Sequence, residues 1–458
     1  MNYCYKVVYP TTAFLAEAGY AKVAHLPCIF DSRPGYHRVG SQFLIDRGLG
    51  YWDPKHRGKV QLPIPPTAIS MKNYADRLAN FLEWCDRRGL DPLMVEYSCD
   101  LIGRYQQEML KGIWSANNRR LSENTINQRI ETAIDFATWA ADKGLRAEFT
   151  VPKITRTHIA HSAFSSVGHE LRHVEVREGK LREPKRRLGF PSESEINAWL
   201  SRVYAKPITG TTEGLICETI LETALRREEA ACLRVDSLPL KKSDWIVPNP
   251  EAAPENQAVL VKIKYGVKGK EYGRDHGTKI GPVGVIRMPM PLALKLHEYR
   301  KIDRANALTI AIQKGRTLAE QRMIRSETVN LFLDPLTGRQ FTGAKIYETW
   351  RSVERPKGWC PHLARDFWAC SLLWRRMEAQ RKLLELALRT EVDKTTLQAL
   401  QMNAQSVIEL EIQPQLRHKS PDTTLIYLQW LSDKLNINLN LHQNLVDELE
   451  NNGDEVEC

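Results

Sequence analysis

Apolar residues recur at helical spacing over much of the chain, and the first clear run begins at Thr67. One face of this predicted helix carries Tyr74, Leu78, Phe81, Leu82 and Cys85, and Gly89 follows its end. A second helix is predicted over about 98–112, and a third runs from Thr125 to Lys143 behind Ser122 as N-cap. The three helices predict a small helical domain.

A different pattern appears at residues 259–265, where apolar and polar positions alternate as in a β-strand. Residues 285–289 can form the antiparallel partner of this strand. Helical spacing prevails elsewhere after position 191. The predicted fold class is therefore mainly α with a small antiparallel β-sheet, an α+β arrangement.

These patterns divide the chain into five segments. They are an N-terminal extension of unknown role (1–66), the small helical domain (67–150), a basic linker (151–190), a larger domain (191–435) and a C-terminal tail (436–458). Two stretches enlarge the larger domain, a charged segment at 303–328 and a long connection at 376–410. Apolar positions between 383 and 388 favour an extra helix in that connection, either packed on the domain or free for a partner.

The charge balance narrows the class of partner. The chain has 65 Lys and Arg against 55 Asp and Glu, a net charge of +10 and a pI near 9.0, which favours a polyanion. Charge alone does not separate DNA from RNA or a membrane surface. Nine cysteines occur without a C-x-x-C pair, and the sequence has neither a run of about twenty apolar residues nor a signal-peptide pattern. A cytoplasmic protein outside the membrane is expected.

Three short motifs combine basic residues with histidines and a tyrosine. Residues 223–234 read TALRREEAACLR, and residues 362–365 read HLAR. Residues 417–427 read RHKSPDTTLIY, with the tyrosine nine positions after the histidine. Guanidinium groups bind phosphate oxygens bidentately, histidines donate hydrogen bonds or move protons near pH 7, and a phenol can act as a nucleophile. The residue types therefore suit phosphoryl transfer.

In this order and at these spacings, the motifs resemble the active site of the tyrosine recombinases, the family of phage-type integrases. The resemblance implies a catalytic domain preceded by a small helical core-binding domain, and a tyrosine that forms a 3′-phosphotyrosine bond with DNA. The catalytic residues that it implies are Arg226, Lys268, His362, Arg365, His418 and Tyr427, with Glu229 as an orienting carboxylate and with no metal or other cofactor.

The lysine rests on the family's G-K-G-type hairpin tip, which Val267-Lys268-Gly269-Lys270 matches best. Because this turn is longer than usual, Lys279 and Lys270 stay open as alternatives. Two other positions depart from the family pattern. Asp366 stands where a histidine commonly follows the arginine, and Arg417 stands where a glycine precedes the later histidine. Neither is expected to touch the six proposed catalytic groups.

Residues 121–129 resemble the DNA-facing helix of the core-binding domain. This resemblance implicates Arg120, Asn124, Asn127 and Arg129 in DNA binding, with a solvated helix face as the alternative. Residues 169–173 read HELRH and also fit the zinc motif H-E-x-x-H. The metalloprotease interpretation is rejected because the segment is highly charged, whereas a buried zinc site needs an apolar helix.

The predicted function is that of a site-specific DNA recombinase or integrase of a mobile genetic element, acting as a homo-tetramer on paired double-stranded DNA sites. The alternatives are a protelomerase- or topoisomerase-like enzyme with the same residues, and a catalytically silent DNA-binding relative. An apolar stripe at Leu428, Leu431, Leu435 and Leu439 either folds back on its own domain or docks on a neighbouring protomer.

Overall fold

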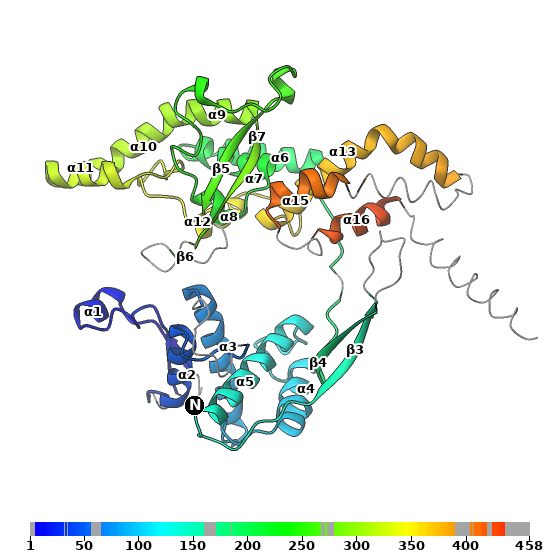
Figure 1. Ribbon diagram of the computed structural model, residues 1–458. Coiled ribbons are helices and arrows are strands. Elements are labelled where there is room, and N and C mark those ends of the chain that lie inside the picture. The colour runs from blue at the N-terminus through cyan, green and yellow to red at the C-terminus, as the bar shows by residue number, and fades with distance from the viewer. Residues whose placement is uncertain are drawn as a thin grey trace, which may run out of the picture. The chain divides into compact units, whose positions relative to one another are not determined.

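The computed structural model divides the chain into two compact units, residues 1–185 with 272–278 and residues 186–271 with 279–458. The structure describes residues 5–31, 33, 35–55, 66–159, 171–184, 186–266, 271–272, 279–389, 404, 406–418 and 424–435. Helices dominate both units, and the sheets have two or three strands (Figure 1). The predicted fold class, mainly α with small antiparallel sheets, is confirmed. Among the described residues, no helix is both long and apolar enough to cross a lipid bilayer.

The N-terminal unit is built mainly from helices. Its elements are β1 (Lys6–Val8), α1 (Thr12–Glu17), β2 (Cys28–Phe30), α2 (Arg38–Leu49), α3 (Ala68–Arg87), the π-helix η1 (Tyr97–Gln106), α4 (Gln107–Leu110), α5 (Glu123–Asp142), β3 (Lys153–Ile159) and β4 (Leu171–Arg177). The Thr67 hydroxyl caps α3 by accepting from the Ser70 N–H, and the Ser122 hydroxyl caps α5 by accepting from the Thr125 N–H. Both helices start where the sequence predicts.

The core of this unit draws on residues from both sides of position 66. Phe43 of α2 lies 5.7 Å from Phe136 and 5.6 Å from Trp139, both on α5, between ring centroids. The indole N–H of Trp139 donates to the Asp46 carboxylate of α2 (2.9 Å), so the one polar atom of this buried ring has a partner. Residues 38–49 therefore belong to the same packed body as the three predicted helices.

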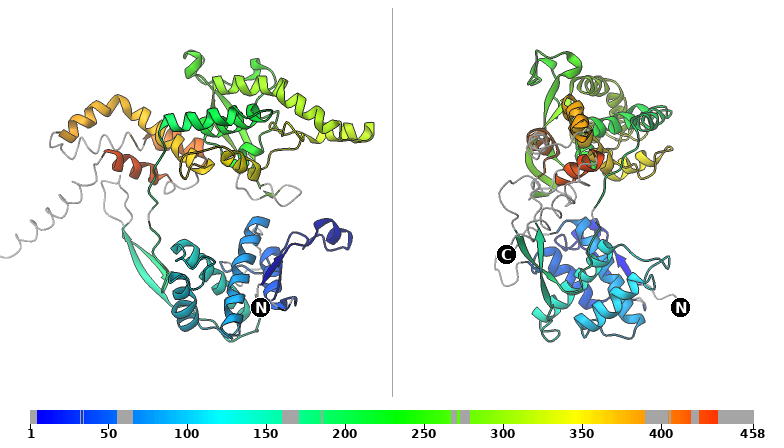
Figure 2. Two further views of the ribbon diagram at one scale, coloured as in Figure 1. Left: turned by 180° about the vertical axis from the view of Figure 1, so that it is seen from behind. Right: turned by 90° about the vertical axis from the view of Figure 1, so that its right-hand side faces the viewer.

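The basic stretch after residue 150 contains a β-hairpin. β3 and β4 pair antiparallel from Lys153 opposite Arg177 to Ile159 opposite Leu171, and Figure 2 shows them as a two-stranded ribbon beside the helices of their unit. The C-terminal half of the H-E-x-x-H sequence, residues 171–173, lies in β4. Since the zinc motif needs its two histidines on consecutive turns of a helix, this strand supports the rejection of a metalloprotease site.

The C-terminal unit surrounds a three-stranded sheet of order β5-β7-β6. Its elements are α6 (Glu193–Tyr204), α7 (Gly210–Thr223), α8 (Arg227–Ala231), the 3-10 helices η2 (Lys242–Asp244) and η3 (Pro254–Asn256), β5 (Ala258–Tyr265), β6 (Glu271–Tyr272), β7 (Lys279–Pro289), α9 (Met290–Lys301), α10 (Asp303–Ile312), α11 (Leu318–Glu327), α12 (Gly343–Arg351), α13 (Pro361–Arg389), the π-helix η4 (Ile408–Ile412), α15 (Gln413–Leu416) and α16 (Leu425–Leu435). β5 and β7 pair antiparallel, which confirms the predicted hairpin.

The two enlarged stretches are helical where they are described. The charged segment forms α10 and α11, and residues 383–388 continue α13 up to Arg389 instead of forming a separate helix (Figure 1). Three tryptophans anchor the core of the unit, with Trp199 4.4 Å from Trp350 and 6.1 Å from Trp359 between ring centroids. α13 starts in this core, which includes Ala364, and its later part runs away from it (Figure 1).

A strained residue ends α7. Ala224 has φ 54° and ψ 29°, in the left-handed region, and its side chain is fully buried. A residue other than glycine costs about 1–2 kcal/mol in this region, because Cβ approaches the following carbonyl oxygen. The chain reversal at Ala224 places Leu225 in the core and makes Arg226 the N-cap residue of α8. The first motif is thus a tight helix-to-helix corner.

Substitution Ala224→Gly should lower stability less than Ala→Gly at a residue with ordinary backbone angles. Relief of the left-handed strain, about 1–2 kcal/mol, offsets the loss of one buried methyl group, about 0.8 kcal/mol, and the greater freedom of glycine in the unfolded chain, about 0.5–1 kcal/mol. We expect the free energy of unfolding of this unit to stay within about 1 kcal/mol of wild type in chemical denaturation. Ala205, the C-cap residue of α6 with φ −72°, is the matched control, and Ala205→Gly should lower stability because it relieves no strain. A larger loss of stability in Ala224→Gly than in Ala205→Gly would contradict the strain argument.

Candidate active site

Glu229 organises the first motif from inside the fold. It is fully buried and accepts from the backbone N–H of Arg226 (2.7 Å) and from the Arg226 guanidinium (2.8 Å). These two bonds fix the backbone of Arg226 and the guanidinium end of its side chain. The side chain of Arg226 itself is 31 % exposed, so its remaining donors can reach a ligand. The predicted orienting role of Glu229 fits this geometry.

Arg417 reaches the same carboxylate from the third motif. Its guanidinium forms an ion pair with Glu229, and its backbone has φ 52°, in the left-handed region that favours glycine. The stem of Arg417 passes over Gly284 of β7, where any Cβ would overlap it. Burial alone would raise the pKa of Glu229, but the charges of Arg417 and Arg226 outweigh it and lower the pKa.

Arg365 joins all three motifs. It is 3 % exposed, and its two terminal nitrogens donate to the backbone carbonyls of Ala224, in the first motif, and Leu416, next to the third. Burial and the neighbouring positive charge of Arg226 lower the pKa of its guanidinium. His362 lies three residues before Arg365 on α13, but its side chain is 70 % exposed. Arg365 therefore holds the cluster together, and His362 lies at its rim.

His418 is neutral at pH 7 in this arrangement. Burial, followed by the positive charges of Arg365 and Arg226, lowers its pKa to about 4. Its Nδ1 atom is buried and has no hydrogen-bond partner among the described residues. The imidazole ring lies nearly parallel to the ring of Tyr427, at 14° and 6.4 Å between centroids. The spacing of nine residues thus allows the two rings to stack on each other.

Tyr427 lies on α16 and is 1 % exposed. Its hydroxyl donates to Oδ1 of Asp366 on α13 at 3.1 Å. Burial and the Asp366 carboxylate raise the pKa of the phenol. The expectation that Asp366 stands apart from the six catalytic groups is wrong, because the carboxylate contacts the proposed nucleophile directly. Arg417 contacts Glu229 and none of the six by a hydrogen bond among the described residues.

Arg186 completes the surroundings of Asp366. Its guanidinium donates to Oδ2 of Asp366 at 2.6 Å and lies 3.3 Å from Nε2 of His362. The cluster therefore holds more guanidinium groups than carboxylates. The cations are Arg186, Arg226, Arg365 and Arg417, and the carboxylates are Glu229 and Asp366. An excess of fixed positive charge at one place suits an anionic ligand such as a phosphodiester.

The lysine remains a prediction. Lys268 and Lys270 lie outside the described residues, and Lys279 is the first residue of β7. The described end of β5 does approach the first motif closely. Gly266 has φ 74°, and a Cβ there would overlap the backbone of Glu228 and Glu229 on α8. The turn that carries the candidate lysines therefore starts against the helix that follows Arg226.

The proposed DNA-facing side of α5 is divided between exposed and buried residues. Asn124 is exposed and the Arg120 side chain is 62 % exposed, whereas Arg129 is half-buried with its guanidinium 3.8 Å from Met109 Sδ. Asn127 is 3 % exposed and bonds inside its unit to the backbone of Leu181 and to Arg177. The structure contradicts a DNA-binding role for Asn127, because its amide is used in packing.

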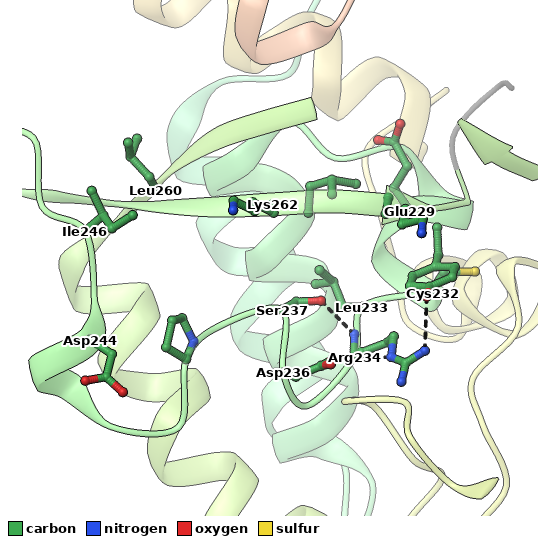
Figure 3. A pocket seen from close by; sticks show the side chains of 14 residues that line it. Glu229, Cys232, Leu233, Arg234, Asp236, Ser237, Asp244, Ile246, Leu260 and Lys262 are labelled. Atoms are coloured by element: carbon green, nitrogen blue, oxygen red, sulfur yellow. Dashed lines mark hydrogen bonds and ion pairs between the residues drawn. The ribbon is translucent and has the colours of Figure 1, made fainter. Parts of the chain in front are cut away.

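A cavity of about 360 Å³ lies beside β5 (Figure 3) and shares Glu229 with the cluster. Arg234, Lys262 and Tyr265 are among its other lining residues, with Arg234 donating to the Tyr265 hydroxyl at 3.3 Å. Arg226, Arg365, His418 and Tyr427 are not among its lining residues. The candidate reaction centre is therefore the cluster, and the cavity is a separate feature of the same unit.

Sequence reasoning missed Gln415, which locks three segments together. Its side-chain amide donates to the carbonyls of Thr223 (2.9 Å) and Arg287 (3.0 Å), and its oxygen accepts from the Arg287 N–H (2.8 Å). Gln415 thereby ties α15 to the end of α7 and to β7. Its place two residues before the third motif is the one signal in the sequence, and spacing alone does not reveal its partners.

No family model and no curated protein match this chain. Solved structures do match. The structure of the Tn1549 transposon integrase with circular intermediate DNA is 16 % identical, covering 85 % of this chain and 94 % of that one with a TM-score of 0.43. A post-cleavage complex of the XerH site-specific recombinase with a palindromic difH substrate is 14 % identical, covering 82 % and 80 %, with a TM-score of 0.44.

Substitution Glu229→Gln should destabilise the C-terminal unit by about 3–5 kcal/mol at pH 7, because it leaves Arg226 and Arg417 without their buried carboxylate. Folding lowers the pKa of Glu229, so its contribution is present above the unfolded carboxyl pKa of about 4.3 and is lost as the pH falls through the lower folded value. The difference between wild type and variant should therefore shrink in acid denaturation below about pH 4.

The control for this measurement is Glu298→Gln on α9, where the carboxylate is 55 % exposed and pairs with the neighbouring Lys301. It should leave stability nearly unchanged. Equal effects of the two substitutions at pH 7 would contradict the assignment of Glu229 as the buried counter-ion.

Proposed function

We propose that the protein is a site-specific DNA recombinase or integrase that cuts and rejoins DNA strands through Tyr427. One observation carries the proposal. Three motifs that span about 200 residues of the sequence converge, with Arg365 bonded to Ala224 in the first motif and to Leu416 directly before the third, and with Tyr427 stacked on His418. Gathering partly buried cations around a phenol costs desolvation free energy, and ionisable groups with perturbed surroundings of this kind cluster at functional sites.

The chemistry follows from the groups present. The Tyr427 oxygen attacks the scissile phosphorus and forms a 3′-phosphotyrosine bond, and the 5′ oxygen leaves. Arg226 and Arg365 stabilise the charge on the non-bridging oxygens, and His362 and His418 donate to the same oxygens. Lys268 protonates the leaving oxygen. The bond energy is retained in the covalent intermediate, so a 5′-hydroxyl of another strand can reverse the step without a metal or other cofactor.

The partners belong to the same proposal. The substrate is double-stranded DNA, bound by residues 67–150 as a core-binding domain and residues 191–435 as a catalytic domain, with residues 151–190 between them. Arg120, Asn124 and Arg129 are the candidates for contacts from α5. We further propose that the protein acts as a homo-tetramer on two paired DNA sites, belongs to a mobile genetic element and is cytoplasmic. The tail at 436–458 lies outside the described residues, and its docking on a neighbouring protomer stays a prediction.

Substitution Tyr427→Phe should abolish the covalent adduct and leave DNA binding nearly unchanged, because it removes only the attacking oxygen. A suicide substrate nicked near the cleavage point, resolved on a denaturing gel, measures the adduct. Tyr347→Phe, which changes a more exposed tyrosine of the same unit, is the control and should form adduct like wild type. A covalent band in Tyr427→Phe would refute the assignment.

Adduct formation by wild type excludes the catalytically silent relative. Joining of two duplexes separates recombination from topoisomerase- or protelomerase-like action.

A 5′-bridging phosphorothioate identifies the lysine, since a thiolate leaves without needing a proton. Lys268→Ala should cleave the ordinary substrate about 10²–10⁴-fold more slowly than wild type and recover on the sulfur substrate. Arg226→Ala should stay inactive on both, because its charge stabilisation is needed in either case. Recovery with Lys279→Ala or Lys270→Ala in place of Lys268→Ala would move the role to that residue.

A further inference from the structure

We infer that Asp366 is a catalytic residue that accepts the phenolic proton of Tyr427 during strand cleavage. This inference rests on the proposed function, because it names the base for the same reaction. Sequence comparison with the family pattern marks position 366 only as a departure from the usual histidine. In the structure this carboxylate accepts a hydrogen bond from the Tyr427 hydroxyl, which is the group that must lose a proton.

The geometry meets the first requirement of a general base. The Tyr427 hydroxyl and Oδ1 of Asp366 are 3.1 Å apart, within the 2.6–3.2 Å over which a proton transfers directly. Both residues are buried, at 1 % and 4 % exposure, so water does not compete for the proton. They lie on α16 and α13, which pack against each other. The contact is therefore built into the helix packing and does not depend on a loop.

The second carboxylate oxygen is held in place. Oδ2 of Asp366 accepts from Arg186 at 2.6 Å and lies 4.0 Å from Nε2 of His362. This leaves Oδ1 directed at the phenol. Among the histidines, His418 contacts the ring of Tyr427 by stacking, whereas His362 faces Asp366 and Arg186. The hydrogen-bond acceptor of the Tyr427 hydroxyl is thus a carboxylate. Protein kinases also use a carboxylate to take a proton from a hydroxyl nucleophile.

The step balances in atoms and charge. A lone pair of the Tyr427 oxygen forms the new bond to phosphorus while the phenolic proton moves to Oδ1 of Asp366. The bond from phosphorus to the 5′ oxygen breaks, and its electron pair goes to that oxygen, which takes a proton from the lysine proposed above. In the reverse reaction a 5′-hydroxyl attacks, the lysine recovers its proton, and Asp366 returns the first proton to the departing phenolate.

Single-turnover rates of adduct formation on the nicked substrate test this inference. Asp366→Asn keeps the size of the side chain and an oxygen acceptor but cannot take a proton. We expect it to slow adduct formation by about 100-fold or more while DNA binding in gel shifts is retained. Glu298→Gln, which removes an exposed carboxylate of the same unit, should keep the wild-type rate. An equal or faster rate in Asp366→Asn would overturn the inference and indicate that the hydrogen bond restrains Tyr427.

A fluorinated tyrosine at position 427 separates proton transfer from a merely structural effect. Its phenol has a lower pKa and needs less help from a base, so the deficit of Asp366→Asn should fall below about 10-fold. An undiminished deficit would overturn the inference. If Asp366→Asn does not fold, Asp366→Glu replaces it, since its longer stem displaces the carboxylate, and fluorination must again restore the rate.

The outcomes also distinguish the two proposals. Wild type that forms no adduct on any substrate contradicts the proposed function itself. Wild type that forms adduct while Asp366→Asn matches its rate leaves the function standing and removes only Asp366 from the mechanism.

Discussion

The candidate site depends on one buried guanidinium. Arg365 donates to the carbonyls of Ala224 and Leu416, which lie at the C-terminal ends of α7 and α15. The last carbonyls of a helix have no partner within it, and the helix dipole makes these ends attractive to cations. One side chain thus satisfies two helix ends and joins segments about 190 residues apart. Without this cation, the two corners would have to bury unpaired carbonyls.

The charges around Arg365 are only partly balanced. Glu229 neutralises Arg226 and Arg417 in part, and Asp366 is shared between Arg186 and Tyr427. Burial and, after it, the remaining positive charge lower the pKa of His418. An anion bound in the cluster would oppose the effect of the positive charge, since a negative charge nearby favours the imidazolium. The protonation state of His418 is therefore coupled to ligand binding.

The sequence was a good guide to periodic structure and to the order of the motifs. The hairpin of β5 and β7 and the starts of α3 and α5 follow from alternation and capping residues, which act locally. Contacts between segments that are far apart in the sequence could not be predicted from these local patterns. Spacing shows which residues share a helix face, but it does not show that Asp366 meets Tyr427 or that Asn127 is buried against Leu181. Comparison with the family pattern did not reveal a role for Asp366. The pattern shows that a carboxylate replaces the usual histidine, but it does not show which residue the carboxylate contacts.

The close passage of Arg417 over Gly284 couples the residue types that the two positions can hold. Any side chain at 284 would occupy the space of the Arg417 stem, and the arginine in turn supplies a counter-ion to Glu229. A larger residue at 284 would displace the arginine stem and leave the buried carboxylate of Glu229 with one guanidinium fewer. The absence of a side chain on a strand thus supports the charge balance of a helix whose sequence position is more than fifty residues away.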